Sequence, residues 1–252
     1  MSDFRTIFNN LDKLCDKWDP YFDVYEKHFR KFVGKSPKIL EIGIYKGGSA
    51  EMWLKYFGEG TTIVGVDINP ECKQYATPDF EVVIGDAGDL MFWNKFQLFP
   101  NDYDIIIDDG GHHMDQQIFT LQKTWNSLKP GGVYLCEDTH TSYWDHWPNA
   151  GYQKPSSFIE YSKGIIDGLH ADHTTKGPDG ETFVGPKIKR PIGSQVAGIS
   201  FYDSMVVIDK KLEDKPFKRV FSHVQEVEPP KTEDTKDLNI ISGDAILSIR
   251  TK

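Results

Sequence analysis

The sequence predicts an α/β fold built on a doubly wound, mostly parallel sheet. Short apolar runs, among them Ile39–Ile42, Thr62–Asp67 and Ile105–Ile107, recur between helical patterns and turn residues. Runs of this length are typical of strands buried on both faces of a parallel sheet. Several of them end in an acidic residue, and ligands of such sheets bind beyond the carboxyl ends of the strands. The acids therefore mark the expected site.

Length, charge and cysteine content indicate a soluble protein. The chain has 252 residues, enough for one sizeable domain, and 38% of them are hydrophobic. A net charge of −9 argues against a nucleic-acid partner. The three cysteines lack metal-ligand spacing and fit a reducing compartment. Since no stretch approaches the roughly 20 apolar residues that cross a bilayer, we expect a cytoplasmic protein without a membrane partner.

The N-terminal segment, residues 1–35, carries aromatic residues at helical spacing. We expect a helix that begins at Pro20 with Asp19 as its cap. Its expected role is to pack on the sheet or to cover the site. Contact between a ligand and Tyr21 or Tyr25 is the alternative.

The turn after Ile39–Ile42 has the pattern Glu-x-Gly-x-x-x-Gly-x-Ser, which starts at Glu41 and ends at Ser49. Its glycines, Gly43 and Gly47, permit close approach of the backbone to a ligand, and the following helix offers free N–H groups. In a dinucleotide fingerprint a glycine stands where this chain has Glu41. A carboxylate there repels phosphate and suits a cationic or polar ligand. A plain tight turn explains the pattern about as well.

Two further strands are predicted to end in acids. Asp67 closes the strand Thr62–Asp67, where an acid can accept both hydroxyls of a ribose, while capping of a helix before Pro70 is the alternative. The strand Phe80–Asp86 brings Asp86 and Ala87 to a position where they could line an adenine pocket. We expect Asp89 only to cap the next helix.

The central stretch carries the strongest chemical signal. The runs Ile105–Ile107 and Val133–Cys136 are each followed by a pair of acids, and a helix over about 114–128 and a turn over Lys129–Gly132 connect them. Neighbouring parallel strands would bring the four acids to one edge, with His112 beside them. Carboxylates so close repel each other unless a cation or donors compensate. The pattern therefore predicts a divalent metal site next to a base, and the acids are Asp108, Asp109, Glu137 and Asp138.

The rest of the chain departs from the α/β rhythm. We expect a serine-capped helix over 156–169, and a polar helix end rather than metal ligands at His170, Asp172 and His173. The long polar segment Thr174–Ser194 is predicted to be a lid or binding loop. A hairpin of Val196–Tyr202 and Met205–Asp209 is expected to close the sheet. Residues 240–249 are expected to form one more short element.

This order of units, with Glu41, Asp67 and Asp86 at three strand ends, resembles the class I S-adenosylmethionine-dependent methyltransferases. The stretches 108–112 and 137–144 are similar to those of the metal-dependent macrolide-sugar O-methyltransferases of the mycinamicin and tylosin pathways. The cephalosporin-hydroxylase-like group is a wider relative, and the similarity covers about residues 18–210. The family pattern departs at Gly111 and His113, which leaves the acceptor open.

The resemblance implies S-adenosylmethionine and Mg²⁺ as cofactors and His112 as the catalytic base. It implies Asp109, Glu137 and Asp138 as metal ligands. The expected cofactor-binding residues are Glu41, Gly43, Gly47, Ser49, Asp67, Ile68, Asp86, Ala87 and Asp108. On this basis we expect one domain over residues 1–252, with a core at 36–145, a lid or acceptor region at 146–195 and a closing hairpin and tail at 196–252.

The predicted function is transfer of a methyl group to a hydroxyl of a sugar or sugar-bearing small molecule. One alternative is an NAD-dependent Rossmann oxidoreductase, against which Glu41 and the lack of a Tyr-x-x-x-Lys pair after the fifth strand count. Another is a non-catalytic nucleotide-binding module, against which the intact set of acids and histidine counts. The expected partner is a small-molecule acceptor, and a homo-oligomer is compatible with the sequence.

Overall fold

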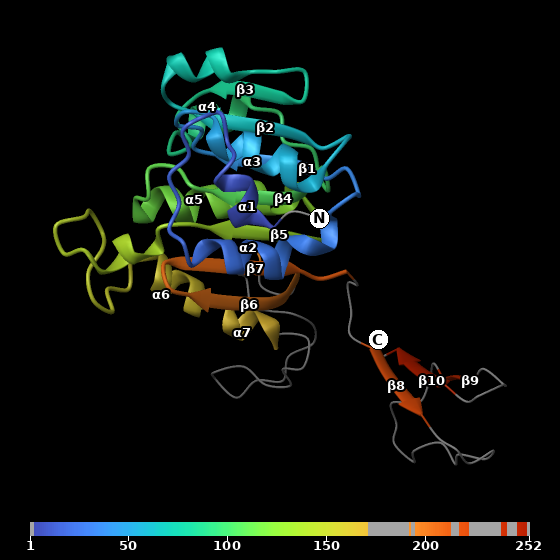
Figure 1. The fold of residues 1–252 in the computed structure, drawn as a ribbon. Coiled ribbons are helices and arrows are strands. Elements are labelled where there is room, and N and C mark those ends of the chain that lie inside the picture. Colours follow the sequence, from blue (N-terminus) through green and yellow to red (C-terminus); the bar gives the residue numbers. More distant parts are fainter. Residues whose placement is uncertain are drawn as a thin grey trace.

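The computed structural model describes residues 3–170, 192, 195–212, 217–221, 238–240 and 246–250. A seven-stranded sheet with the order β3-β2-β1-β4-β5-β7-β6 forms its centre (Figure 1). Strands β1 to β5 are parallel, and β7 and β6 run antiparallel at one edge. Their bounds are β1 Lys38–Ile42, β2 Thr62–Asp67, β3 Phe80–Ile84, β4 Tyr103–Asp108, β5 Leu128–Cys136, β6 Val196–Tyr202 and β7 Met205–Lys210. The predicted doubly wound sheet and its closing hairpin are confirmed.

The strand order reverses between β1 and β4. From β1 the chain builds outward through β2 to β3, and it then returns to add β4 on the other side of β1. Ile42 at the end of β1 pairs with Val66 of β2 on one side and with Asp108 of β4 on the other. Loops therefore diverge from a common edge at this reversal, which is where ligands of doubly wound sheets bind.

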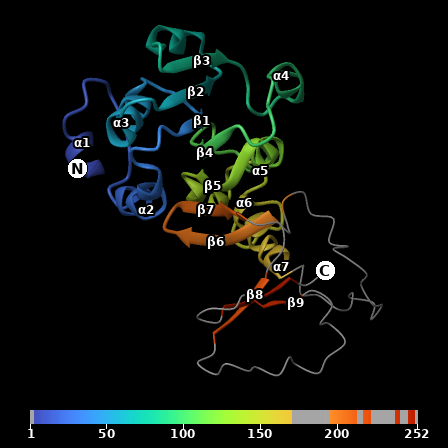
Figure 2. The ribbon, with the colours of Figure 1, turned by 90° about the vertical axis from the view of Figure 1, so that its right-hand side faces the viewer.

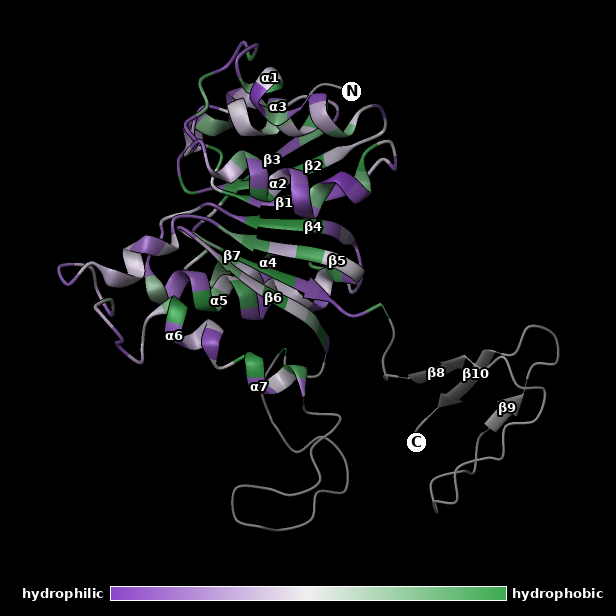
Figure 3. Ribbon diagram, turned by 60° about the horizontal axis from the view of Figure 1, so that its bottom comes forward, coloured by the Kyte–Doolittle hydropathy of each residue, from purple (hydrophilic) through white to green (hydrophobic). Residues whose placement is uncertain are grey.

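Helices cover both faces of the sheet (Figure 2). One face packs on α1 Phe4–Phe8, α2 Tyr21–Phe29 and α3 Gly48–Phe57, and the other on α4 Leu90–Lys95, α5 Met114–Thr124, α6 Phe158–Lys163 and α7 Ile166–Leu169. Successive strand residues alternate between the two cores: Ile39 packs with Trp53, and Leu40 belongs to the core of Trp125. Figure 3 shows how hydrophobic residues concentrate along these strands.

Short 3₁₀ helices complete the connections: η1 Arg30–Phe32, η2 Pro70–Tyr75, η3 Trp125–Ser127 and η4 Thr139–Tyr143. Among the described residues, none of the helices has the length and apolar character needed to cross a bilayer.

Several predicted boundaries were wrong. Helix α2 has Pro20 at its N-cap position, and Asp19 instead accepts hydrogen bonds from Arg5, because that guanidinium bridges Asp19 and Asp23. Residues 129–132 belong to β5 rather than to a separate turn. Gly131, at φ +78°, lies in the part of β5 where its pairing with β4 shifts register.

Other helix and strand ends are shorter than expected. The helix after β4 ends at Thr124, and β3 ends at Ile84 rather than at Asp86. The helix predicted over 156–169 is divided into α6 and α7, and the Ser157 hydroxyl caps α6 by accepting from the Glu160 N–H. Asp89 caps α4 as predicted.

The C-terminal strands form a second sheet of three antiparallel strands. They are β8 Phe217–Phe221, β9 Leu238–Ile240 and β10 Ile246–Arg250, where the sequence predicted one short element. The predicted lid over Thr174–Ser194 lies outside the described residues except for Ile192, which is buried. Asp172 and His173 lie outside them as well, and the single-domain organisation stays a prediction.

Candidate active site

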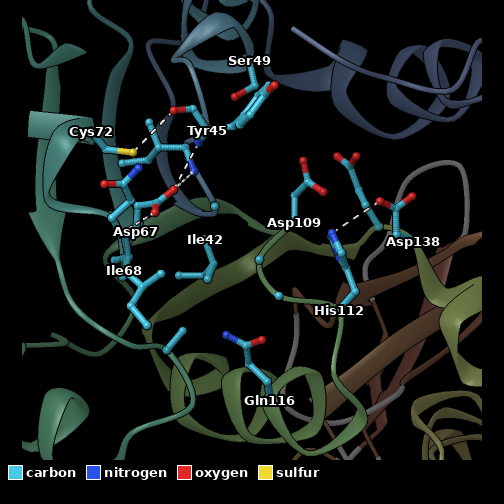
Figure 4. A pocket seen from close by; sticks show the side chains of 18 of the residues that line it. Ile42, Tyr45, Ser49, Asp67, Ile68, Cys72, Asp109, His112, Gln116 and Asp138 are labelled. Carbon is cyan, nitrogen blue, oxygen red and sulfur yellow. Dashed lines mark hydrogen bonds and ion pairs between the residues drawn. The ribbon is translucent and has the colours of Figure 1, made fainter. Parts of the chain in front are cut away.

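A cavity of about 1150 Å³ opens beyond the carboxyl ends of the parallel strands. Its lining comes from the loops after β1 to β5 and from the chain that precedes α2. In Figure 4, Asp67 and Ile68 lie on one side of the cavity, and Asp109, His112 and Asp138 lie on the other. The cavity therefore has two chemically different sides. We call the side with Asp67 and Ile68 the β2 half, and the side with Asp109, His112 and Asp138 the acid half.

Gly43 sets the distance between the loops after β1 and β4. Its φ is +92°, and a Cβ at this position would lie 2.0 Å from the backbone oxygen of Asp109. Only glycine accepts both that dihedral and that contact. Since the Asp109 N–H also donates to the Ile42 carbonyl at 2.9 Å, the turn after β1 fixes the backbone that carries Asp109.

Glu41 lies behind the cavity wall rather than on it, which differs from the prediction. Its carboxylate is fully buried and accepts a hydrogen bond of 2.8 Å from Trp53 Nε1, while Oε2 has no partner. Burial raises the pKa of Glu41 to about 7. The reason is strand alternation: Ile42 lines the cavity, so the preceding side chain points to the face covered by α3.

Gly47 and Asp108 are also absent from the cavity lining, although both were predicted to bind the cofactor. Gly47 packs beneath Tyr75, whose Cβ would lie 3.0 Å from an added Cβ. The buried Asp108 carboxylate accepts a hydrogen bond of 3.0 Å from the Tyr134 hydroxyl, and burial raises its pKa to about 7. These two residues support the wall.

Asp67 lines the cavity and also holds two loops together. Its Oδ2 accepts hydrogen bonds from the N–H groups of Ile44 at 2.8 Å and Tyr45 at 3.1 Å, and its Oδ1 accepts from Asn69 at 2.8 Å. Asn69, not Asp67, caps the helix that begins at Pro70. The carboxylate is half-buried, so it can serve a ligand only while it supports this loop pair.

The other residues predicted for the β2 half lie on its wall. Ile68 is 67% exposed, and Ala87 is buried with its carbonyl accepting from Trp93 Nε1. Asp86 accepts a hydrogen bond of 2.7 Å from the Gly88 N–H. Ser49 borders the cavity at the start of α3.

The acid half gathers the predicted metal ligands. Asp138, at φ +53°, accepts a hydrogen bond of 2.6 Å from the Tyr21 hydroxyl, and Glu137 accepts one of 2.7 Å from the Tyr25 hydroxyl. Asp109, His112 and Asp138 each offer a ligand atom within 4.8 Å of the others, and Glu137 lies outside that group. Both tyrosines therefore orient acids, a role that the sequence analysis did not predict.

His112 is held in an unusual backbone conformation, at φ +56°. Its carbonyl accepts hydrogen bonds from Thr141 Oγ1 at 2.9 Å and Trp147 Nε1 at 3.0 Å. Its Nε2 lies 3.5 Å from Asp138 Oδ2, and its Nδ1 is buried without a partner. This clamp turns the ring of His112 toward the acids (Figure 4).

His113 and His140 take different positions. The exposed ring of His113 stacks on Trp147 at a centroid distance of 4.6 Å, so it does not join the acids. His140 has its Nδ1 4.0 Å from Asp138 Oδ1 and hydrogen bonded with the Ser204 hydroxyl. It also contacts the rings of Trp18 and Trp144, at centroid distances of 6.2 and 5.0 Å.

Lys17 is the site residue that sequence reasoning missed. Its Nζ lies 2.5 Å from Asp109 Oδ2 and 2.8 Å from Glu137 Oε2, and its side chain is 2% exposed. Burial opposes the charge, but the two carboxylates outweigh it and hold the pKa of Lys17 well above its ordinary value. Lys17 stands in a segment without a recognisable motif, so no pattern could have found it.

Comparisons with known proteins agree with this fold. Residues 40–139 match a family model described as a methyltransferase domain. The chain is 28% identical over 206 residues to 8-demethyl-8-alpha-L-rhamnosyl tetracenomycin-C 2'-O-methyltransferase of Streptomyces olivaceus, covering 78% of this chain and 52% of the relative. It is 34% identical over 167 residues to demethylmacrocin O-methyltransferase of Streptomyces fradiae, covering 62% and 41%.

Among solved structures, the MycE methyltransferase in complex with Mg, SAH and mycinamycin VI superposes with a TM-score of 0.71 at 21% identity. The match covers 83% of this chain and 54% of that one. The chain thus spans about half the length of the curated relatives it matches. Residues 40–139 thus match the methyltransferase domain family model, and the sheet around them has the same fold as the MycE methyltransferase.

Proposed function

We propose that the protein is an S-adenosylmethionine- and Mg²⁺-dependent O-methyltransferase that acts on a hydroxyl of a sugar or a sugar-bearing small molecule. One observation carries the proposal: Asp109, His112 and Asp138 converge at one end of a cavity whose other end has Asp67 and Asp86 on its wall. The family match and the O-methyltransferase relatives support the same reaction class.

The β2 half suits S-adenosylmethionine. Asp67 ends β2, where a carboxylate can accept hydrogen bonds from the hydroxyls of a ribose. Asp86 and Ala87 line the neighbouring part of the cavity after β3. Through Gly43, the loop after β1 lies close against the backbone of Asp109 in the loop after β4. A sulfonium needs no phosphate cradle and is attracted by the acids across the cavity.

The acid half suits a magnesium ion. Carboxylate oxygens are the ligands this ion prefers, and Asp109 and Asp138 present theirs within 4.8 Å of each other and of His112. We propose Asp109, Glu137 and Asp138 as the ligands, which requires Glu137 to exchange its contact with Lys17 for one with the ion. When bound, the ion would supply stabilisation of negative charge on an acceptor oxygen.

His112 is the proposed base. An alcohol is a poor nucleophile near neutral pH, so its proton must be removed as the carbon–oxygen bond forms. The ring of His112 lines the cavity beside the acids, and Asp138, at 3.5 Å, would stabilise the imidazolium that results. The remaining task of the cavity is to hold the acceptor hydroxyl about 3–3.5 Å from the methyl carbon.

Aromatic side chains beside Asp138 support a sugar-bearing acceptor. Trp18 lines the cavity, its ring contacts that of His140, and His140 in turn contacts Trp144. Both tryptophans are substantially exposed, at 62% and 39%. Exposed apolar surface rimmed by polar groups is typical of ligand-binding grooves, and flat rings can pack against the C–H faces of a sugar.

The NAD-dependent alternative has no observation in its favour, because Glu41 replaces a glycine of the phosphate-binding turn. Calorimetric titration with S-adenosylmethionine and with NAD separates the readings, since the proposal requires the first to bind and not the second. Glycoside and nucleotide-sugar acceptors are then screened for a mass gain of one methyl group. Binding of NAD alone would overturn the proposal. The cytoplasmic location and the oligomeric state stay predictions.

A further inference from the structure

The ten residues that join α1 to the region before α2 form a strap along the cavity, and we use this name for residues 9–18. Leu14, Cys15, Asp16, Lys17 and Trp18 all line the cavity. The strap therefore brings side chains from the start of the chain to acids that follow β4 and β5. Its most consequential side chain is Lys17, whose ammonium stands between Asp109 and Glu137.

The first half of the strap is anchored to α3 by contacts that do not involve the acids of the cavity. The N–H groups of Asp12 and Lys13 donate to the Glu51 carboxylate at 2.9 and 3.0 Å. The chain then presses on α3, because a Cβ at Gly48 would lie 2.4 Å from the Leu14 carbonyl oxygen. Lys17 thus lies near the C-terminal end of a strap whose first half is held by α3.

We propose that Lys17 is the resident cation of the metal-free site and that Mg²⁺ takes its place, so that metal binding releases the strap from the acids. This inference rests on the proposed function, because it concerns the same carboxylates. Lys17 Nζ already occupies the space between Asp109 Oδ2 and Glu137 Oε2. A magnesium ion held by both residues would need oxygens at about 2.0–2.1 Å and would occupy that same space.

Both cations cannot remain there together. Two positive charges a few ångströms apart repel strongly in a buried site, and Lys17 is 2% exposed. Without either cation, however, the buried Glu137 carboxylate would face Asp109 with no positive charge between them. Lys17 therefore keeps the two acids side by side until the metal arrives, which makes it a positioning residue.

The exchange lowers the apparent metal affinity. If the state with Lys17 bound predominates at least about tenfold, the apparent dissociation constant for Mg²⁺ rises by the same factor. Removing the ammonium should therefore tighten binding of the metal. We expect Lys17→Met, which keeps most of the apolar stem, to bind Mg²⁺ about tenfold or more tightly than the wild type.

The first test is calorimetric titration of the full chain with MgCl₂ alone, without S-adenosylmethionine. Lys17→Met is compared with the wild type and with Lys13→Met, whose side chain is on the strap but not in the cavity lining. Tighter binding by Lys17→Met alone supports the inference. Equal affinity in all three proteins overturns the inference and leaves the proposed function standing. No binding of Mg²⁺ by any of them overturns both.

The second test needs no variant, so it remains decisive if Lys17→Met fails to fold. Acylation of lysine amines in the wild type is followed by mass spectrometry with and without saturating MgCl₂. The Lys17 amine, 2% exposed between the two acids, should be labelled faster when the metal is bound, while labelling of Lys13, which lies outside the cavity lining, should not change. Unchanged protection of Lys17 at saturating Mg²⁺ would refute the exchange.

Discussion

Replacing Asp67 by alanine should weaken both the fold and the proposed cofactor site. The carboxylate accepts three backbone hydrogen bonds, from Ile44, Tyr45 and Asn69. A hydrogen bond contributes about 0.5–1.5 kcal/mol net, and more when one partner is charged. In the variant, the three N–H groups lie in partly exposed loops and can bind water instead. We therefore expect the free energy of unfolding to fall by roughly 2–4 kcal/mol.

For a chain of this size, each kcal/mol lowers the melting temperature by about 2–4 °C. Asp67→Ala should therefore unfold some 5–15 °C earlier than the wild type. If the same carboxylate also accepts ribose hydroxyls, the dissociation constant for S-adenosylmethionine should rise at least about tenfold. Thermal unfolding followed by circular dichroism gives the first quantity, and titration calorimetry gives the second below the transition.

Asp86→Ala is the matched control, because Asp86 lines the same cavity but accepts one backbone N–H, from Gly88. Its melting temperature should fall by about a third as much. The reasoning fails if Asp67→Ala melts no earlier than Asp86→Ala. An Asp67→Ala protein that loses stability but keeps its cofactor affinity would assign Asp67 to loop support alone.

The remaining predictions concern the base, the acceptor wall and a buried acid. His112→Ala should lower turnover by about 10²–10⁴-fold, the usual range for a general base. His113→Ala should lower turnover far less, because the ring of His113 stacks on Trp147 away from the acids. A larger loss of turnover in His113→Ala than in His112→Ala, measured in steady-state assays, would contradict the assignment of the base. Trp144→Ala should raise KM for a glycoside acceptor and leave calorimetric S-adenosylmethionine affinity unchanged, and an unaltered KM would remove the ring from the acceptor site. Because burial raises the pKa of Glu41 from 4.5 to about 7, its contribution to stability is present below pH 4.5 and is lost as pH rises through 7, by up to roughly 3 kcal/mol. Glu41→Gln lacks this loss, so melting curves at pH 5 and pH 8 should favour the variant only at the higher pH, and parallel shifts would refute the buried ionisation.

Sequence patterns were sufficient for the sheet because each strand repeats the same signal. The apolar runs at 39–42, 62–67 and 105–107 all became parallel strands, and three of the four acids predicted to meet, Asp109, Glu137 and Asp138, line the cavity at one edge. The hairpin was also predicted, with Val196–Tyr202 as observed and Met205–Asp209 one residue short of β7, since alternation in one run and continuity in the other distinguish an edge strand from a covered one.

The orientation of individual side chains could not be predicted in the same way. Glu41 and Asp108 carry the right chemistry at the right strand ends, yet strand alternation and packing against Trp53 and Tyr134 place both carboxylates behind the wall. Lys17 reaches the acids from a distant segment, and this depends on how the strap packs on α3. Contacts between segments far apart in the chain leave no local pattern in a sequence.

The central claim is that the acid half needs a divalent cation for methyl transfer. The most direct measurement follows methyl transfer from S-adenosylmethionine to a glycoside acceptor identified by the mass screen, first in MgCl₂, then after chelation with EDTA, and again after MgCl₂ is restored. We expect activity to disappear on chelation and to return with the metal, because an ion held by the proposed ligands Asp109, Glu137 and Asp138 would stabilise the acceptor oxygen. Full methyl transfer in the presence of excess EDTA would contradict it.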